Sequence, residues 1–264
     1  MPFVAYRAFG WTPVEITAEW GLRDLKPGMG YNVCASVLCR DCGMLFLDMR
    51  FDDEEMGGLY SDYRGEAYTA ARDRFEPGYA ARNALLLDGS KYVARIEAFL
   101  RPHLAVEKPR ILDWGGDTGV NTPFRTQAAC HDIYDISSRP PLSGARMVAH
   151  GQAKSRSYDL VVFANVLEHV PKPREALSEL ADAMNADTLL YVEVPHEDAI
   201  RLIAAPDMRL KSKRHWHEHI NFFTQKALEI AFRDAGLTIR QIVSHPVTAG
   251  GKDSFVFSIA ARRA

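Results

Sequence analysis

The sequence predicts an α/β fold in which a mostly parallel sheet is covered by helices on both faces. Three observations lead to this prediction. From Lys108 onward, short apolar strands alternate with segments of helical periodicity. A glycine-rich turn, residues 115–119, directly follows the first of these strands. Near the C-terminus, two strands separated by Gly250 and Gly251 are placed to form an antiparallel pair at one sheet edge.

The composition is that of an ordinary globular protein. The chain has 264 residues, 47% hydrophobic and 25% charged, which fits one large domain or a core domain with an appendage. A net charge of −2 gives no support for a nucleic-acid partner. No apolar stretch reaches the roughly 18 residues of a membrane span, and the N-terminus lacks a signal-peptide apolar segment. We therefore expect a cytoplasmic protein without a membrane span, whose oligomeric state the sequence does not fix.

The cysteines are too few and too clustered for a disulfide framework: they are Cys34, Cys39, Cys42 and Cys130. Cys39 and Cys42 form one CxxC pair followed by Gly43, which is half of a zinc knuckle. A structural zinc site needs four ligands, usually from two such pairs. Segment 34–46 is therefore knuckle-like but degenerate, and we expect reduced thiols rather than zinc.

Residues 1–107 are predicted to form an N-terminal cap. Short strands are expected at Tyr31–Val37 and Met44–Leu47. The acidic run 52–55 places carboxylates in the first turn of a helix that reaches Tyr60. A longer helix is predicted from Pro77 or Gly78 to Leu104, because apolar residues recur there at helical spacing.

Residues 108–264 are predicted to form the sheet domain. Its expected strands are Arg110–Trp114, Asp132–Asp135, Asp159–Ala164, Leu189–Val194, Thr238–His245 and Ser254–Arg262. Its expected helices are Pro173–Met184 and Thr224–Ala235, the second closed by Gly236.

The glycine turn indicates which cofactor this domain binds. Gly115, Gly116 and Gly119 do not have the G-x-G-x-x-G spacing of a dinucleotide site, and no Walker lysine follows Gly119. Asp117 would also place a carboxylate where a phosphate should lie, which is electrostatically unfavourable. S-adenosylmethionine carries a sulfonium and an ammonium group and no phosphate, so nearby carboxylates favour its binding.

This part of the sequence resembles the class I methyltransferases that use S-adenosylmethionine. Asp113, Gly115 and Gly119 match three of the four fixed positions of their D-x-G-x-G-x-G motif, and Asp117 replaces the central glycine. The resemblance covers roughly residues 108–264 and implies a Rossmann-like, seven-stranded sheet with an antiparallel edge strand. Gly116 belongs to the same cofactor turn.

Two further segments carry the resemblance. Asp135 ends the next strand, where the family has an acidic residue that binds the ribose hydroxyls, and Ile136 beside it is expected to contact the adenine. Residues 158–170 resemble the family's fourth strand and following turn. That match implies that Asn165 and Val166 lie at the cofactor's methionine end.

Methyl transfer from a sulfonium is a direct displacement, so the enzyme must align the acceptor and supply it in an electron-rich form. A hydroxyl or carbon acid then needs a general base, for which histidine has a suitable pKa. His169, which ends a Leu-Glu-His segment, and His219, within residues 214–223, are the two candidates.

Residues 214–223 resemble a His- and aromatic-rich loop of the methyltransferase subgroup associated with sugar and surface-polysaccharide biosynthesis. In nucleotide-sugar C-methyltransferases of that kind, a Glu-His pair removes a proton from the sugar, and Glu218 and His219 match this pair. The cysteine pair and residues 60–68 resemble the subgroup's substrate-binding region, although full members usually have a second CxxC. The resemblance implies a sugar substrate, with the methyl acceptor a hydroxyl or a carbon next to a keto group.

Several alternatives remain at this point. Tyr63, Arg64 and Tyr68 are assigned to the substrate, with the arginine suited to a diphosphate, but they can equally pack the cap. We assign no metal to the site, yet Glu168 with the two histidines has the donor set of a divalent-cation site. The acceptor can instead be a small phenolic or amine metabolite. Finally, the chain can be a non-catalytic module that only binds S-adenosylmethionine.

Overall fold

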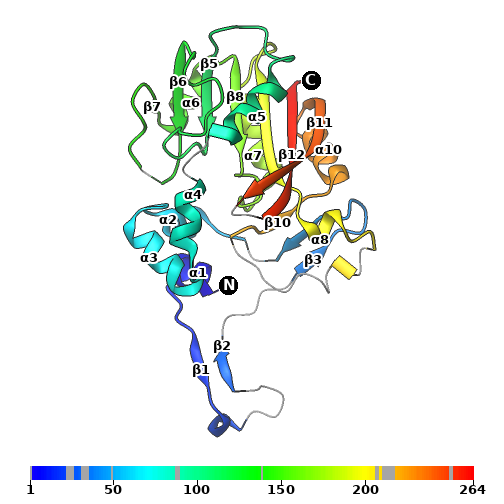
Figure 1. The fold of residues 1–264 in the computed structure, drawn as a ribbon. Coiled ribbons are helices and arrows are strands. Elements are labelled where there is room, and N and C mark those ends of the chain that lie inside the picture. Colours follow the sequence, from blue (N-terminus) through cyan, green and yellow to red (C-terminus); the bar gives the residue numbers. More distant parts are fainter. Residues whose placement is uncertain are drawn as a thin grey trace.

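The computed structural model describes residues 2–21, 27–30, 36–48, 50–86, 90–137, 139–205, 208–209, 218–249 and 252–264. A seven-stranded sheet in the order β11-β12-β9-β8-β5-β6-β7 forms the centre of the molecule (Figure 1). The strands are β5 (Arg110–Trp114), β6 (Cys130–Tyr134), β7 (Arg146–Met147), β8 (Leu160–Ala164), β9 (Leu189–Pro195), β11 (Leu237–Ala249) and β12 (Lys252–Arg263).

The strand directions confirm the predicted fold class. Strands β7, β6, β5, β8 and β9 pair in parallel, whereas β12 is antiparallel to both β9 and β11. Asp113 of β5 pairs with Ile133 of β6 and with Val162 of β8, so these three strands end at nearly the same level. The turns that follow them therefore meet along one edge of the sheet, where open α/β sheets bind their ligands.

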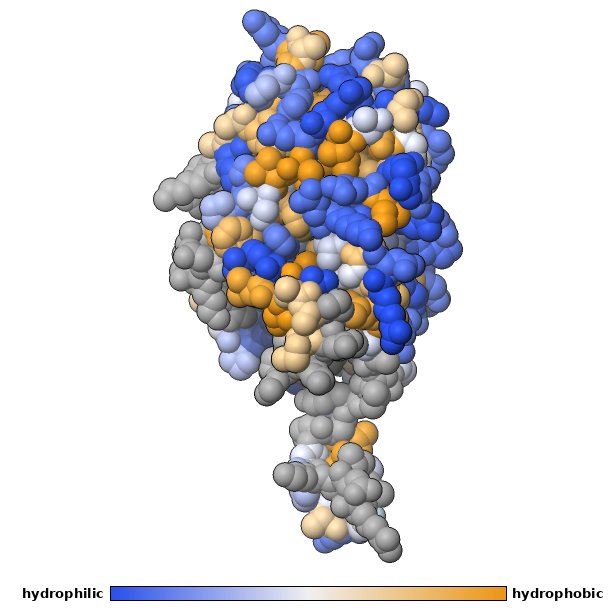
Figure 2. Space-filling model, turned by 90° about the vertical axis from the view of Figure 1, so that its right-hand side faces the viewer, coloured by the Kyte–Doolittle hydropathy of each residue, from blue (hydrophilic) through white to orange (hydrophobic). Residues whose placement is uncertain are grey.

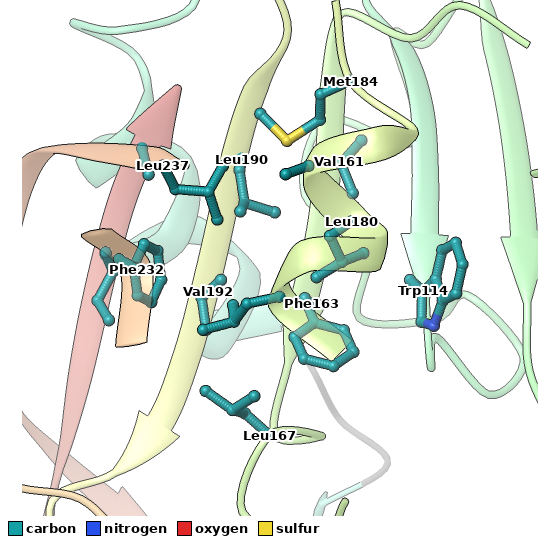
Figure 3. Close-up of a cluster of buried hydrophobic side chains, with 14 of the residues drawn as sticks. Trp114, Val161, Phe163, Leu167, Leu180, Met184, Leu190, Val192, Phe232 and Leu237 are labelled. Atoms are coloured by element: carbon teal, nitrogen blue, oxygen red, sulfur yellow. The ribbon is translucent and has the colours of Figure 1, made fainter. Parts of the chain in front are cut away.

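Helices cover both faces of the sheet, and each face has its own apolar core. On one face lie α6 (His150–Ser155), α7 (Pro173–Asp182) and α10 (Gln225–Asp234). Figure 3 shows this core, in which Val161, Phe163 and Val192 of the sheet pack with Leu180 and Phe232 of the helices. On the other face, α5 (Ser90–Leu100) covers β5, β8 and β9.

The cap consists of four helices gathered beside the sheet edge (Figure 1). They are α1 (Pro2–Phe9), α2 (Asp53–Tyr60), α3 (Glu66–Phe75) and α4 (Tyr79–Leu86). The predicted start of α2 is confirmed: Asp52 and Glu55 form a reciprocal capping box, each carboxylate accepting the other residue's backbone N–H at 2.8 and 2.9 Å. Leu59 and Tyr68 are fully buried in the cap core.

A small sheet joins the cap to the sheet domain. Strand β4 (Leu45–Leu47) pairs antiparallel with β3 (Ser36–Leu38) and with β10 (Asn221–Phe222). Ile220, immediately before β10, belongs to the cap core. The segment that carries His219 is therefore fixed by strands from both ends of the sequence.

Two predicted elements differ from the structure. The helix predicted from Pro77 or Gly78 to Leu104 corresponds to two described helices, α4 and α5, and the second ends at Leu100; residues 87–89 between them lie outside the described residues. Of the predicted strand at 31–37, residues 31–35 lie outside the described residues, and β3 covers 36–38.

A narrow arm extends from the cap, built from β1 (Val14–Ile16), the short helix η1 (Ala18–Trp20) and β2 (Gly28–Gly30) (Figure 1). A four-residue helix, α8 (Asp198–Arg201), follows β9. Hydrophobic and hydrophilic residues are intermixed on the face shown in Figure 2. Within the described ranges, no helix combines the length and the apolar character that a bilayer crossing requires.

Candidate active site

The glycine turn follows β5 and is held to the neighbouring strand by its backbone. The N–H of Gly115 donates to the carbonyl of Tyr134 at 2.7 Å. Gly115 and Gly119 have φ of +82° and +81°, and Asp117 between them has φ of +53°. Aspartate is one of the few residue types that adopt this left-handed conformation readily. The residue that departs from the D-x-G-x-G-x-G motif therefore keeps the backbone conformation for which glycine is usually needed.

Close packing explains why two of these positions are glycine. A Cβ atom on Gly115 would lie 2.4 Å from Cγ2 of Val166, and one on Gly116 would lie 2.4 Å from Cγ of Asp113. Such approaches are far shorter than van der Waals contact. The turn thus rests directly on the strand end before it and on the turn after β8, both of which carry predicted cofactor residues.

Asp113 lies on the buried side of the turn. Its side chain is 5% exposed, and it accepts a hydrogen bond from the Thr122 hydroxyl, which in turn contacts Nε2 of His131 at 2.9 Å. Burial raises the pKa of Asp113 to about 7. This arrangement gives Asp113 a supporting position beneath the turn, and direct contact with the cofactor stays a prediction.

Asp135 connects the end of β6 to the glycine turn. Its two carboxylate oxygens accept the backbone N–H groups of Asp117 at 2.8 Å and Ser137 at 2.7 Å. An ionised carboxylate offers about four acceptor positions, so two hydrogen bonds leave capacity for the hydroxyls of a ribose. Ile136, the neighbouring residue, is 48% exposed and offers an apolar surface of the kind that an adenine ring contacts.

Asp117 places a second carboxylate at the glycine turn, beside Asp135. Its carboxylate contacts one nitrogen of Arg139 at 2.9 and 3.0 Å. Burial raises the pKa of Asp117, and the guanidinium groups of Arg139 and Arg64 act in the opposite direction. Arg64 of the cap therefore lies near enough to the glycine turn to influence it.

The turn after β8 completes the predicted cofactor edge. Asn165 has φ of +55°, and its backbone N–H donates to the carbonyl of Glu193 at 2.9 Å. Its side-chain amide donates to the Tyr92 hydroxyl at 3.0 Å. Glu193 is fully buried and pairs with Arg95 at 2.5 Å. Val166 packs against Gly115, as described above, so the predicted residues Asn165 and Val166 do lie beside the glycine turn.

Glu168 and His169, which follow Asn165 and Val166 in the chain, meet His219 from the segment before β10. We call these three residues the His–Glu cluster. The two imidazole rings are 4.7 Å apart, and Nε2 of His169 is 3.6 Å from Oε1 of Glu168. Among the described residues, these three are the one group of His, Cys, Asp and Glu side chains whose ligand atoms gather closely enough for a metal ion, all within 4.8 Å. The structure thus brings together both histidines that the sequence selected.

The partners of the two histidines define how each ring is oriented. Nδ1 of His169 lies 3.0 Å from the backbone carbonyl of Glu218, and Nδ1 of His219 lies 3.1 Å from Oε1 of Glu197. A carbonyl or carboxylate oxygen only accepts, so Nδ1 is the donor in both rings. The carboxylate of Glu218, predicted as the partner of His219, is 2.5 Å from Nη1 of Arg72 on α3.

Aromatic residues of the cap cover the His–Glu cluster. The Tyr60 ring lies 5.8 Å from the His169 ring, edge to face, and Tyr63 packs between Tyr60 and Tyr68 at 5.5 and 5.2 Å. The Arg64 guanidinium lies over the Tyr63 ring at 5.0 Å. Burial raises the pKa of Tyr63 to about 12. Tyr63 and Arg64 thus lie near the predicted site, whereas Tyr68 is fully buried within the cap.

Three residues of the site escaped the sequence analysis: Glu197, Arg72 and Tyr60. Glu197 follows β9 at the same sheet edge as Asp135 and Asn165, and this position after an apolar strand was the signal that could have selected it. Tyr60 contacts the His169 ring and Arg72 contacts Glu218 only because the cap packs on the sheet domain, and no local sequence pattern reveals such packing.

The cysteine pair serves the fold in the structure. Backbone carbonyls of this turn bind the start of α10: Thr224 donates to the carbonyl of Cys42, and Lys226 donates to that of Asp41, both at 2.6 Å. Cys39 and Cys42 are free thiols, and no metal-binding group of three forms around them within the described part of the chain. Cys34, the third candidate ligand, lies outside the described residues.

The sheet order, the glycine turn and the acidic residue after β6 together define a Rossmann-like domain of the class I methyltransferase type. Comparison with known families agrees. The chain belongs to the family described as "Methyltransferase domain", whose model matches residues 82–242. This confirms the predicted enzyme class, and the site has the carboxylates that suit S-adenosylmethionine. No match was found among curated proteins.

Several solved structures are similar to this chain at low sequence identity, and the first of those that follow supports the fold. A Burkholderia thailandensis 1,6-didemethyltoxoflavin-N1-methyltransferase with bound S-adenosylhomocysteine is 15% identical, with a TM-score of 0.54 over 87% of this chain and 99% of that one. The Synechocystis PCC 6803 magnesium protoporphyrin IX methyltransferase, also with S-adenosylhomocysteine, is 14% identical, with a TM-score of 0.49 over 74% and 99%. LepI in complex with S-adenosylmethionine is 15% identical, with a TM-score of 0.45, and the match spans 62% of this chain and 46% of LepI.

Proposed function

We propose that this chain transfers the methyl group of S-adenosylmethionine to a sugar, at a hydroxyl or at a carbon next to a keto group. One observation carries the proposal. Val166 packs against Gly115 of the cofactor turn, and the His–Glu cluster begins two residues later. A group that can activate an acceptor therefore lies beside the position expected for the methyl donor.

The charges at the turn favour this cofactor over a phosphate-bearing one. Asp117 and Asp135 both direct carboxylates to the cofactor edge. These groups would repel a diphosphate and attract a sulfonium or an ammonium group. Asp135 also keeps acceptor capacity for two ribose hydroxyls.

His219 is the proposed general base. Its Nδ1–H is bonded to Glu197, which leaves the lone pair on Nε2 and orients the ring. Burial lowers the pKa of His219, against the opposing effect of the Glu197 hydrogen bond, so the imidazole is neutral near pH 7 and able to accept a proton. Glu197, rather than Glu218, is the carboxylate that we propose orients His219.

The sugar assignment is supported by the cap as well as by the Glu218–His219 sequence. Arg64 lies over the Tyr63 ring and, against the larger effect of burial, acts to lower the pKa of Asp117 in the glycine turn, and its guanidinium suits the diphosphate of a nucleotide sugar. Aromatic rings such as Tyr60 and Tyr63 beside the His–Glu cluster suit the flat faces of a sugar ring.

The function is tested by incubating the protein with methyl-labelled S-adenosylmethionine and a panel of nucleotide sugars. We expect mass spectrometry to show the gain of one labelled methyl group on one panel member, with fragmentation locating it on carbon or oxygen. Labelling of a phenol or an amine in a parallel metabolite panel, with no sugar product, would show that the acceptor is a small metabolite and not a sugar. Binding of the cofactor without any product would favour a non-catalytic module.

Two variants test the assigned roles. Arg64→Ala is expected to raise the KM for the nucleotide sugar with little change in kcat, whereas the exposed Arg74→Ala leaves both unchanged. His219→Ala is expected to lower kcat by roughly 10²–10⁴-fold, the usual contribution of a general base. Full turnover in His219→Ala would show that His219 is not the general base.

A further inference from the structure

Glu168 poses a problem that a general base at His219 does not solve. Its side chain is buried, with the residue 1% exposed, and neither carboxylate oxygen has a hydrogen-bond partner among the described residues. An ionised carboxylate in such a place is strongly unfavourable unless a positive charge or several donors accompany it. The nearest nitrogen given by the structure is Nε2 of His169, at 3.6 Å. A group that binds Glu168 is therefore expected in this space.

The two histidines are arranged as metal-binding histidines are. In such sites each imidazole binds the metal through one nitrogen and donates its other N–H to a carbonyl or carboxylate, which fixes the ring and the tautomer. His169 donates Nδ1–H to the carbonyl of Glu218, and His219 donates Nδ1–H to Glu197. Nε2 is the metal-binding nitrogen in this tautomer, and Nε2 of His169 faces Glu168.

We propose that Glu168, His169 and His219 bind one divalent first-row metal ion. Their ligand atoms lie within 4.8 Å of one another, which small side-chain movements can bring to ordinary coordination distances. Two imidazoles and one carboxylate favour Mn²⁺, Fe²⁺, Co²⁺ or Zn²⁺ over Ca²⁺ or Mg²⁺, which prefer oxygen ligands. Three protein ligands leave further coordination positions for water or for an oxygen atom of the acceptor.

The consequence for the reaction rests on the proposed function. An acceptor hydroxyl bound to the ion becomes more acidic, so its O–H bond breaks and the proton passes to solvent. The resulting oxygen lone pair forms the bond to the methyl carbon, and the electrons of the carbon–sulfur bond return to sulfur. The products are a methyl ether, S-adenosylhomocysteine and one proton, and the ion keeps its charge. With the ion bound, His219 is a ligand, and acidification by the ion replaces its role as base.

Manganese binding to the chelator-treated full chain tests the site without any substrate. We expect one Mn²⁺ per chain by titration of the free-ion electron paramagnetic resonance signal, with spin-echo modulation from imidazole nitrogen. Glu168→Gln should abolish this binding, and Glu197→Gln should weaken it about 10–100-fold, as outer ligand partners usually do. Glu175→Gln, whose side chain on α7 is 71% exposed, should bind like the wild type.

Two results would overturn the proposal. One is the absence of stoichiometric binding of Mn²⁺, Co²⁺ and Zn²⁺ to the wild-type chain, which needs no variant to interpret. The other is unchanged binding in a folded Glu168→Gln chain. These results are independent of the sugar. Methyl transfer that persists fully in chelator would refute the metal site and leave the proposed function intact. Metal binding without sugar methylation would support the metal site and refute the proposed function.

Discussion

Gly115→Ala is the substitution that tests the packing of the cofactor turn most sharply. The backbone at this position has φ of +82°, and a left-handed conformation destabilises an L-residue by about 1–2 kcal/mol. The new Cβ would also lie 2.4 Å from Cγ2 of Val166, and overpacking of this kind costs about 1–3 kcal/mol. Together these effects predict that the free energy of unfolding falls by about 2–5 kcal/mol.

Two other glycines separate the contributions in urea unfolding curves. Gly144 has φ of +89° with no atom within 4 Å of a built Cβ, so Gly144→Ala should lose only about 1–2 kcal/mol. Gly116 lacks a left-handed φ, but its Cβ would meet the side chain of Asp113 at 2.4 Å, so Gly116→Ala isolates the steric effect. The reasoning fails if Gly115→Ala destabilises the chain no more than Gly144→Ala, or if it leaves S-adenosylmethionine affinity untouched.

Two further predictions concern buried charge. Burial lowers the pKa of His131 to about 4, so between pH 6.5 and 4 the unfolded chain binds a proton that the folded chain excludes. The contribution of this histidine to the free energy of unfolding should decrease by up to about 3 kcal/mol as the pH falls through this range, so the difference in urea curves between the wild type and His131→Gln should change with pH in that direction. Arg72→Ala removes a buried guanidinium that pairs with the carboxylates of Glu218 and Glu76 and lies over the Phe3 and Tyr79 rings, so it should destabilise the chain by about 3–5 kcal/mol. The exposed Arg74→Ala serves as its control in thermal unfolding, and equal losses for the two arginines would contradict the importance of the ion pair.

The sheet domain could be predicted from the sequence because its signals are local. Strand β5 and the glycine turn were predicted at the residues where the structure has them, since an apolar run ending in glycines has few alternative structures. The position of Asp135 beside the glycine turn could be predicted for the same reason, because the residue after a parallel strand lies at the edge where open α/β sheets bind ligands. The predicted end of the helix at Leu104 lies four residues beyond the end of α5 at Leu100, because apolar residues continue past that end.

The pairing of side chains within the site could not be predicted in the same way. Glu218 adjoins His219 in the sequence, yet its carboxylate pairs with Arg72 of the cap, and Glu197 from the end of β9 contacts the His219 ring. Such partners are chosen by how the cap packs on the sheet edge. Asp117 shows the converse: its side chain departs from the family motif, but its left-handed backbone preserves the turn.

The most direct test of the central claim is calorimetric titration of S-adenosylmethionine into the wild-type chain and into Asp135→Ala. We expect one site per chain for the wild type and an affinity at least about tenfold lower in the variant, because the two charge-assisted hydrogen bonds that we propose from the ribose to Asp135 would be lost. NAD and ATP should not compete, because the turn lacks the dinucleotide spacing and the Walker lysine and places the carboxylate of Asp117 where a phosphate would lie. Binding of either nucleotide in place of S-adenosylmethionine, or no binding of S-adenosylmethionine at all, would contradict the assignment of this turn.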